Sequence, residues 1–224
     1  FSMSTGLLGN HFVADAAFHT TGTDGYVHGT AGKSGSWYAG LSWLGRDFII
    51  RYRNIGNYEH TGQAWSGVTA GTGDLSIMDG TYGKATGIKT YADMYRVGLG
   101  RFNSLYESMD PDTYKTTRYT LNDGSYWPKT TDNFWQDHNI LSAAWDINES
   151  LKTTLSLHYT YGYGYYDEFK PGSKVSKFGF DMVKSNGKPV TSDFVRQKGL
   201  SQNAAGFVYN ISYNNNGWDV IGGL

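Results

Sequence analysis

Hydrophobic and polar residues alternate with a period of two along much of this chain, and helical spacing is almost absent. A period of two is typical of β-strands, whose successive side chains point to opposite faces of a sheet. Eight segments alternate in this way: 1–7, 12–18, 37–43, 48–53, 140–145, 155–164, 206–213 and 218–224. The pattern predicts an all-β, antiparallel fold of about eight strands.

The alternation separates two kinds of residue. One set is apolar and uncharged within these segments, as in Leu155, Leu157, Tyr159, Tyr161 and Tyr163. The opposite set is dominated by small residues and carries the polar residues Asp15, His19, Arg51, Arg53, His158, Asn210 and Asp219. An apolar outer face with a polar inner face is inside-out relative to a soluble barrel, and it indicates a barrel that crosses a membrane.

The connections between the segments alternate in length. Neighbouring segments join in pairs through short turns rich in Gly, Asn and Asp, whereas the other connections are long and span about 20–35, 57–133 and 167–202. All short turns are therefore expected at one end of the sheet and all long loops at the other. Outer-membrane barrels have this asymmetry, with short periplasmic turns and long extracellular loops.

The turn residues, and the alternation of apolar residues on both sides of each turn, predict how the hairpins close. Four-residue turns would place three pairs opposite each other: Leu7 with Phe12, Trp43 with Phe48, and Tyr213 with Trp218. Each pairing keeps the apolar residues of both strands on one face, which a slip by one residue would not do. We then expect an aromatic girdle near the short turns, formed by Trp43, Phe48, Trp145, Tyr213 and Trp218.

Composition narrows the function classes. The formal net charge is −1, from 19 basic and 20 acidic residues, which gives no electrostatic reason to expect a nucleic-acid partner. The chain has no Cys, which excludes disulfides, thiolate metal sites and a Cys nucleophile. No apolar run is long enough for a transmembrane helix. No nucleophile elbow, phosphate loop or paired carboxylate motif occurs, so we expect neither an enzyme nor a cofactor.

Several short stretches, taken together in their order, resemble the TonB-dependent outer-membrane receptors of Gram-negative bacteria. They are STGLLGNHF at 4–12, TDGY at 23–26, TGQAW at 61–65, TDNFWQDH at 131–138, LHYTYGYGYY at 157–166, SDFVR at 192–196 and GFVY at 206–209. The resemblance implies a barrel of the 22-strand type, an N-terminal plug and a short box that engages TonB. This chain shows neither plug nor box. We therefore expect residues 1–224 to form one barrel segment of about eight strands.

Candidate functional residues fall into two groups. Aromatic residues of the long loop are candidates for ligand binding, in particular Trp65, Tyr95, Tyr126 and Trp127, although packing within the loop is the commoner role for such residues. Residues expected to face the lumen, and to contact a plug, are Arg51, Arg53, His138 and His158. We expect no metal site. Two His side chains without a nearby carboxylate form only a weak metal site, and the loop residues Asp110, Asp112 and Asp123 lack the residue order of a calcium-binding loop.

The leading hypothesis is an outer-membrane receptor that imports a scarce nutrient. The resemblance implies energy supplied by the TonB complex through parts of the protein outside this chain, and it favours an iron–siderophore or another metal chelate as the ligand. The expected partners are this small-molecule ligand and outer-membrane lipid. Two alternatives remain open: a passive porin or autonomous small outer-membrane barrel, and a soluble carbohydrate-binding β-sheet protein.

Overall fold

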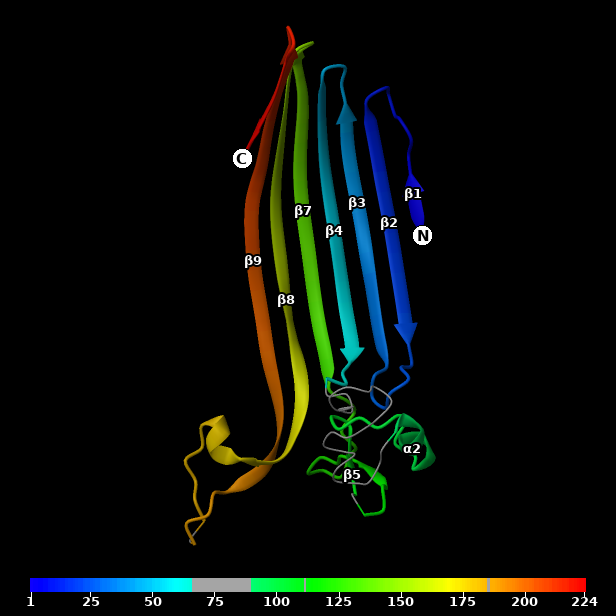
Figure 1. The fold of residues 1–224 in the computed structure, drawn as a ribbon, viewed down its shortest axis with the longest axis vertical. Coiled ribbons are helices and arrows are strands. Elements are labelled where there is room, and N and C mark those ends of the chain that lie inside the picture. Colours follow the sequence, from blue (N-terminus) through cyan, green and yellow to red (C-terminus); the bar gives the residue numbers. More distant parts are fainter. Residues whose placement is uncertain (66–89, 111, 185) are drawn as a thin grey trace.

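The computed structural model of the chain describes residues 1–65, 90–110, 112–184 and 186–224. Its main feature is one antiparallel sheet of eight strands, each hydrogen-bonded to its neighbours along the sheet. The strands, in sheet order, are β1 (Ser2–Ser4), β2 (Phe12–Thr23), β3 (Gly32–Leu44), β4 (Phe48–Gly62), β7 (Thr131–Asn148), β8 (Leu151–Lys174), β9 (Thr191–Asn215) and β10 (Trp218–Gly223). Figure 1 shows β1 and β10 at opposite edges, so the sheet is open. The all-β fold with eight strands is confirmed.

All tight turns lie at one end of the sheet, which we call the turn end, and the long loops lie at the other, the loop end (Figure 1). The predicted asymmetry is confirmed, but the predicted loop ranges are too long. The strands continue until the loops are only 24–31, 63–130 and 175–190. Backbone pairing extends past the point where apolar and polar residues cease to alternate, so hydrophobic periodicity could not find these strand ends.

The hairpin turns are shorter than predicted. Trp43 pairs with Ile50 rather than Phe48, and Tyr213 pairs with Val220 rather than Trp218. Each register differs from the prediction by two residues, so every side chain stays on its predicted face. In the last hairpin, Asn216 and Gly217 both have positive φ, at 53° and 77°. This is the two-residue turn whose twist matches that of its strands. In the first hairpin the bridge to Phe12 comes from Leu8 instead of Leu7, but β1 pairs with β2 in the predicted register, with Met3 opposite Ala16.

The register places the two predicted sets of residues on opposite faces. One row across what we call the apolar face is Ala14, Leu41, Tyr52, Leu141, Leu157 and Phe207. An adjacent row on what we call the polar face is Asp15, Gly40, Arg53, Ile140, His158 and Gly206. Leu41 is 61% exposed and Phe207 57% exposed, so the apolar face is uncovered.

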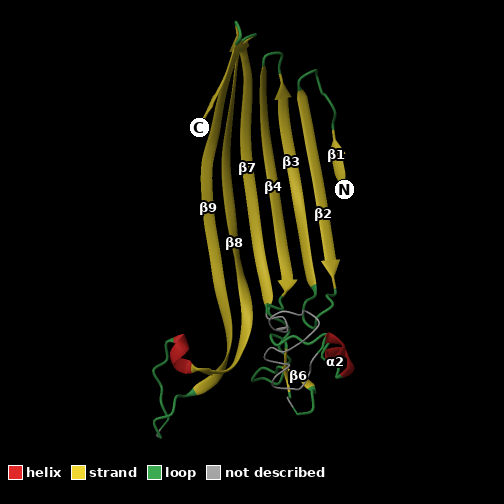
Figure 2. Ribbon diagram, in the orientation of Figure 1, coloured by secondary structure: helices red, strands yellow, loops and turns green. Residues whose placement is uncertain are grey.

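The buried hydrophobic residues of the described chain lie at the loop end and not in the middle of the sheet. They are Met94, Leu99, Trp127, Phe169 and Val175. Figure 2 shows the short elements gathered there: α2 (Tyr91–Arg96), β5 (Glu107–Met109), β6 (Thr116–Arg118) and the 3-10 helix η1 (Val175–Phe178). Thr90 and Asp93 cap α2 reciprocally at its N-terminus. In the described ranges, neither helix could span a membrane.

Candidate functional site

The polar face brings together the residues predicted to face the lumen. Arg51 and Arg53 lie two residues apart on β4, opposite Ser142 and Ile140 of β7. Neither guanidinium forms an ion pair with any residue that the structure describes. Two adjacent, unpaired Arg side chains can bind a carboxylate, since guanidinium groups match its planar geometry.

His138 and His158 are diagonal neighbours on the polar face, because His138 pairs with Thr160 of β8. The Nδ1 atom of His138 lies 2.8 Å from the Thr160 hydroxyl, so that imidazole already has a hydrogen-bond partner. The His158 ring covers Gly206, where an added Cβ would lie 2.5 Å from its Nε2 atom. Among the residues described, no group of three His, Asp or Glu side chains could hold a metal ion.

The four loop aromatics predicted to bind ligand lie at the loop end, but they do not form one cluster. Trp65 packs edge-on against Tyr166 of β8, with ring centroids 4.9 Å apart. Tyr95 accepts a 2.8 Å hydrogen bond from the Tyr26 hydroxyl, a contact that raises the pKa of Tyr26 above its ordinary value. Both Trp65 and Tyr95 are exposed and available to a solute.

Tyr126 and Trp127 are adjacent in sequence but differ in their surroundings. Tyr126 is 61% exposed, and the Arg118 guanidinium lies 4.7 Å from its ring centroid. Trp127 is only 5% exposed and stacks on Phe169 of β8 at 5.9 Å. Its indole therefore anchors the long loop to the sheet, which is the packing role that the sequence left open. A ligand role for these four aromatics stays a prediction.

A buried polar cluster joins the two loops that precede β3 and β7, and the sequence did not predict it. Asn103 donates from its side-chain amide to the carbonyls of His28, at 2.7 Å, and of Gln63, at 2.9 Å. Glu107 is 3% exposed and lies 2.7 Å from Nδ1 of His28. The polar composition of the loops could not predict these contacts, because they join residues 40 to 79 positions apart in sequence.

The loop carboxylates considered for calcium serve the turns in which they lie. Asp110 accepts hydrogen bonds from the backbone N–H groups of Asp112 and Thr113, which lower the pKa of its carboxyl. Asp123 accepts from the hydroxyl and backbone of Ser125, which lowers its pKa in the same way. Both contacts are the local turn chemistry expected of Asp.

The apolar face carries aromatic residues near both ends. The girdle predicted at the turn end is present in part, where Trp43 contacts Phe48 at 6.0 Å and Phe48 pairs with Trp145. A second group at the loop end, which we call the loop-end aromatic group, comprises Trp37, Tyr58, Trp135, Tyr161 and Tyr163. It was not predicted, because Tyr58 and Trp135, which connect Trp37 to Tyr163, lie beyond the alternating segments.

Polar residues also occur on the apolar face beside the loop-end aromatic group. Asp137 accepts from the amides of Asn54, at 2.6 Å, and Asn139, at 2.7 Å. Trp37 donates to Asn54 at 3.0 Å, and Tyr52 donates to Asn139 at 2.5 Å. The expectation of an uncharged face was made for the alternating segments only, and Asp137 lies outside them.

Of the comparisons with known proteins, only the one with solved structures bears on the fold. No family model matches the chain, and no curated protein matches it. A solved structure of the ferric-catecholate import receptor Fiu from E. coli K12, in a closed form, is similar with a TM-score of 0.57 and 12% identity. The similarity covers 99% of this chain but 30% of that receptor, so this chain spans under a third of its length. At this identity the comparison shows the fold alone: an open, antiparallel sheet like part of an outer-membrane receptor barrel.

Proposed function

We propose that this chain is a barrel segment of an outer-membrane receptor that imports a metal chelate. In this proposal the apolar face meets lipid, the polar face lines the lumen, and the loop end faces the cell exterior. The TonB complex supplies energy through parts of the protein outside residues 1–224, and the protein is a transporter rather than an enzyme. The observation that carries the proposal is an open sheet with one exposed apolar face and one polar face, whose long loops all lie at one end.

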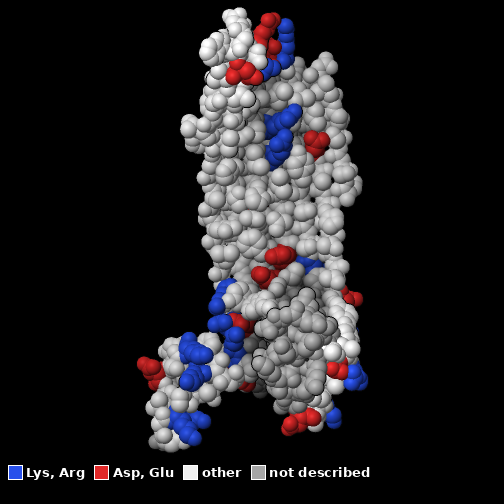
Figure 3. All heavy atoms as spheres, in the orientation of Figure 1, with Lys and Arg blue, Asp and Glu red and all other residues white. Residues whose placement is uncertain are grey.

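The spacing of the two aromatic groups supports a membrane setting. Tyr58 lies ten residues after Phe48 along β4. Ten residues of strand span about 33 Å, or about 25 Å along the membrane normal if the strand tilts by about 40°. Outer-membrane barrels have an apolar band of about 25 Å between their aromatic girdles. Figure 3 shows that most charged groups of the visible face gather near the two ends of the molecule.

Two observations weigh against the alternatives. A soluble sheet would cover its apolar residues, but the apolar face here is exposed along its length, and exposed patches of this size mark membrane or protein contacts. An autonomous eight-stranded barrel would close through its edge strands, but in the described chain β1 pairs with β2 and β10 with β9. A larger barrel accounts for both observations.

The loop end supports capture of a flat or ring-bearing solute. Trp65, Tyr95 and Tyr126 each expose an aromatic ring there. Such rings stack on planar groups, and the catechol rings of an iron chelate are planar. The anionic charge of such a chelate suits the Arg51 and Arg53 guanidinium groups on the polar face, which a solute would meet after passing the loops.

The topology is tested with an epitope tag inserted after Gly124, in an exposed turn of the long loop. The tag is placed in the whole protein that contains this chain. We expect antibody to bind intact cells, and the protein to run as a heat-modifiable band in the outer-membrane fraction. Binding only after the outer membrane is disrupted would reverse the topology, and a soluble protein would refute the proposal.

The ligand class is tested by uptake of ferric-catecholate chelates. The double variant Trp65→Ala, Tyr126→Ala should reduce uptake by about tenfold or more, as loss of aromatic contact residues does in other binding sites. Trp145→Ala is the matched control, because Trp145 is an exposed aromatic residue at the turn end. Equal uptake by both variants and the parent would exclude these aromatics from capture.

A further inference from the structure

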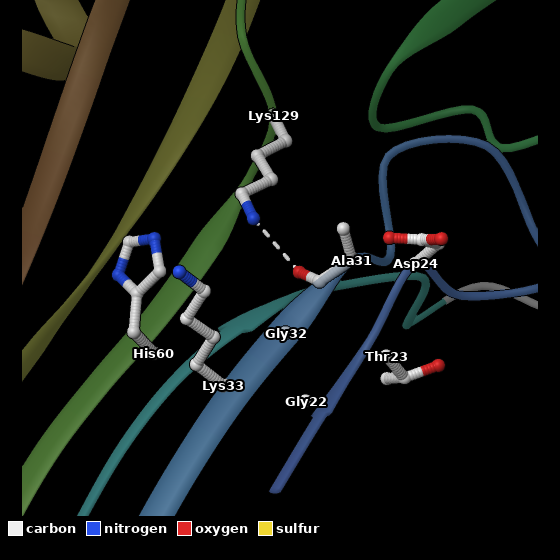
Figure 4. A pocket seen from close by; sticks show the side chains of 8 residues that line it. All are labelled: Gly22, Thr23, Asp24, Ala31, Gly32, Lys33, His60 and Lys129. Atoms are coloured by element: carbon white, nitrogen blue, oxygen red, sulfur yellow. Dashed lines mark hydrogen bonds between the residues drawn. The ribbon is translucent and has the colours of Figure 1, made fainter.

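A pocket of about 500 Å³ lies at the loop end and carries three basic side chains, Lys33 of β3, His60 of β4 and Lys129 of the long loop. Figure 4 shows Lys33 and His60 on one side of this pocket and Asp24 on the other. Two Lys against one Asp leave the pocket with a net positive charge even when His60 is neutral. Neither the transport proposal nor the sequence assigns it a role.

The register places this basic pocket on the apolar face. Lys33 pairs with His60 across β3 and β4, and both are exposed. His60 lies two residues beyond Tyr58, on the same face as the loop-end aromatic group. Two residues of strand are about 7 Å. Lys33 and His60 thus lie just outside the aromatic level and on the face opposite the polar face.

The cations of this pocket have hydrogen-bonding capacity to spare. Lys129 donates to the Ala31 carbonyl at 2.7 Å, which occupies one of the three hydrogens of its ammonium group. His60 contacts the side-chain oxygen of Asn133 through Nδ1, so one nitrogen of its ring is already paired. Neither Lys33 nor Lys129 forms an ion pair with any residue in the described ranges. The pocket therefore suits an anion with several acceptor oxygens.

We propose that Lys33, His60 and Lys129 bind the phosphate group of a glycolipid in the outer leaflet of the outer membrane. This inference rests on the proposed membrane orientation. Aromatic residues then lie at the level of the lipid headgroups, and Lys side chains just beyond them meet the phosphates. A soluble chelate that enters through the lumen would not meet these side chains, because they lie on the other face of the sheet.

Native mass spectrometry of the whole purified protein in non-ionic detergent tests this inference. The probes are diphosphorylated lipid A, the same lipid after removal of its phosphates, and inorganic phosphate. We expect the diphosphorylated lipid to bind, and binding to weaken about fivefold for each of Lys33→Gln and Lys129→Gln. The dephosphorylated lipid should not distinguish these variants from the parent.

Lys198→Gln is the matched control, since Lys198 lies at the loop end but on the polar face. An equal loss with Lys198→Gln, or no loss with the other two variants, would overturn the inference. Inorganic phosphate that binds as tightly as the lipid would also overturn it, because the site would then serve a free anion. Each variant is also tested for a heat-modifiable band in the outer-membrane fraction. Absence of the band would contradict the proposed function, whereas a normal band without the expected lipid binding would contradict only this inference.

Discussion

At the scale of single residues, Asp137 shows how a carboxylate is accommodated on an otherwise apolar face. Its Oδ1 atom accepts hydrogen bonds from Asn54 on the neighbouring strand and from Asn139 on its own strand. Polar groups at the edge of an apolar band cost little when they are hydrogen-bonded and much when they are not. The alternation of the sequence could not predict this arrangement, because it depends on a cross-strand partner 83 positions away.

Replacing Asp137 with Leu tests this network. The variant leaves the Asn54 and Asn139 amides without their shared acceptor, so we expect a loss of about 1–3 kcal/mol in the free energy of unfolding. Urea unfolding of the whole protein in detergent measures it. Asn203→Leu is the control, because Asn203 accepts one hydrogen bond, from Tyr159 on the same face. If both variants lose the same free energy of unfolding, the hydrogen bonds around Asp137 have no special role in stability.

Leu157 and Ser156 test the assignment of the two faces. Leu157 pairs with Leu141 and Phe207 on the apolar face, whereas the Ser156 hydroxyl donates to Ser142 on the polar face at 3.1 Å. Leu157→Arg should destabilise the protein by about 2–4 kcal/mol in a bilayer if the site is near its midplane. A water-soluble maleimide should label Ser156→Cys and not Leu157→Cys, and equal labelling would contradict the register.

At the scale of elements, the sequence predicted the strands better than the loops, and each outcome has a physical reason. The strand 155–164 was predicted from its own alternation, and β8 contains all of it. The loop structure depends instead on contacts between distant segments. Asn103, for example, joins the carbonyls of His28 and Gln63, which belong to two different loops. Local sequence patterns carry no record of such contacts.

Removing the Asn103 amide should therefore loosen both loops together. We expect Asn103→Ala to increase hydrogen exchange across residues 24–31 and 99–107, because two carbonyls lose their donor. Exchange in β8, measured in the same experiment, should not change. Asn122→Ala, in an exposed turn of the same loop, is the control variant. An increase confined to residues 99–107 would show that the two loops are independent.

At the scale of the whole molecule, the open sheet leaves backbone groups of β1 and β10 without a partner strand among the residues that the structure describes. The sequence predicted a segment of a larger barrel, and the small residues of the polar face, such as Gly40 and Gly206, suit a wide lumen and not a narrow closed barrel. The ligand could not be predicted in this way, since it depends on which side chains the loops bring together and on parts of the receptor beyond this chain.

The open edges predict that residues 1–224 are not stable alone in a membrane. Each unpaired N–H or C=O group in lipid costs several kcal/mol, and both edge strands present a row of them. We expect the isolated chain, refolded into detergent and lipid vesicles, to give no heat-modifiable band, whereas the whole protein gives one. Cross-linking adds a geometric check: Cys residues introduced at Met3 and Val220 should not form a disulfide within one chain, because β1 and β10 lie at opposite edges. A heat-modifiable band together with that disulfide would show that the sheet closes on itself, and the protein would then be an autonomous small barrel.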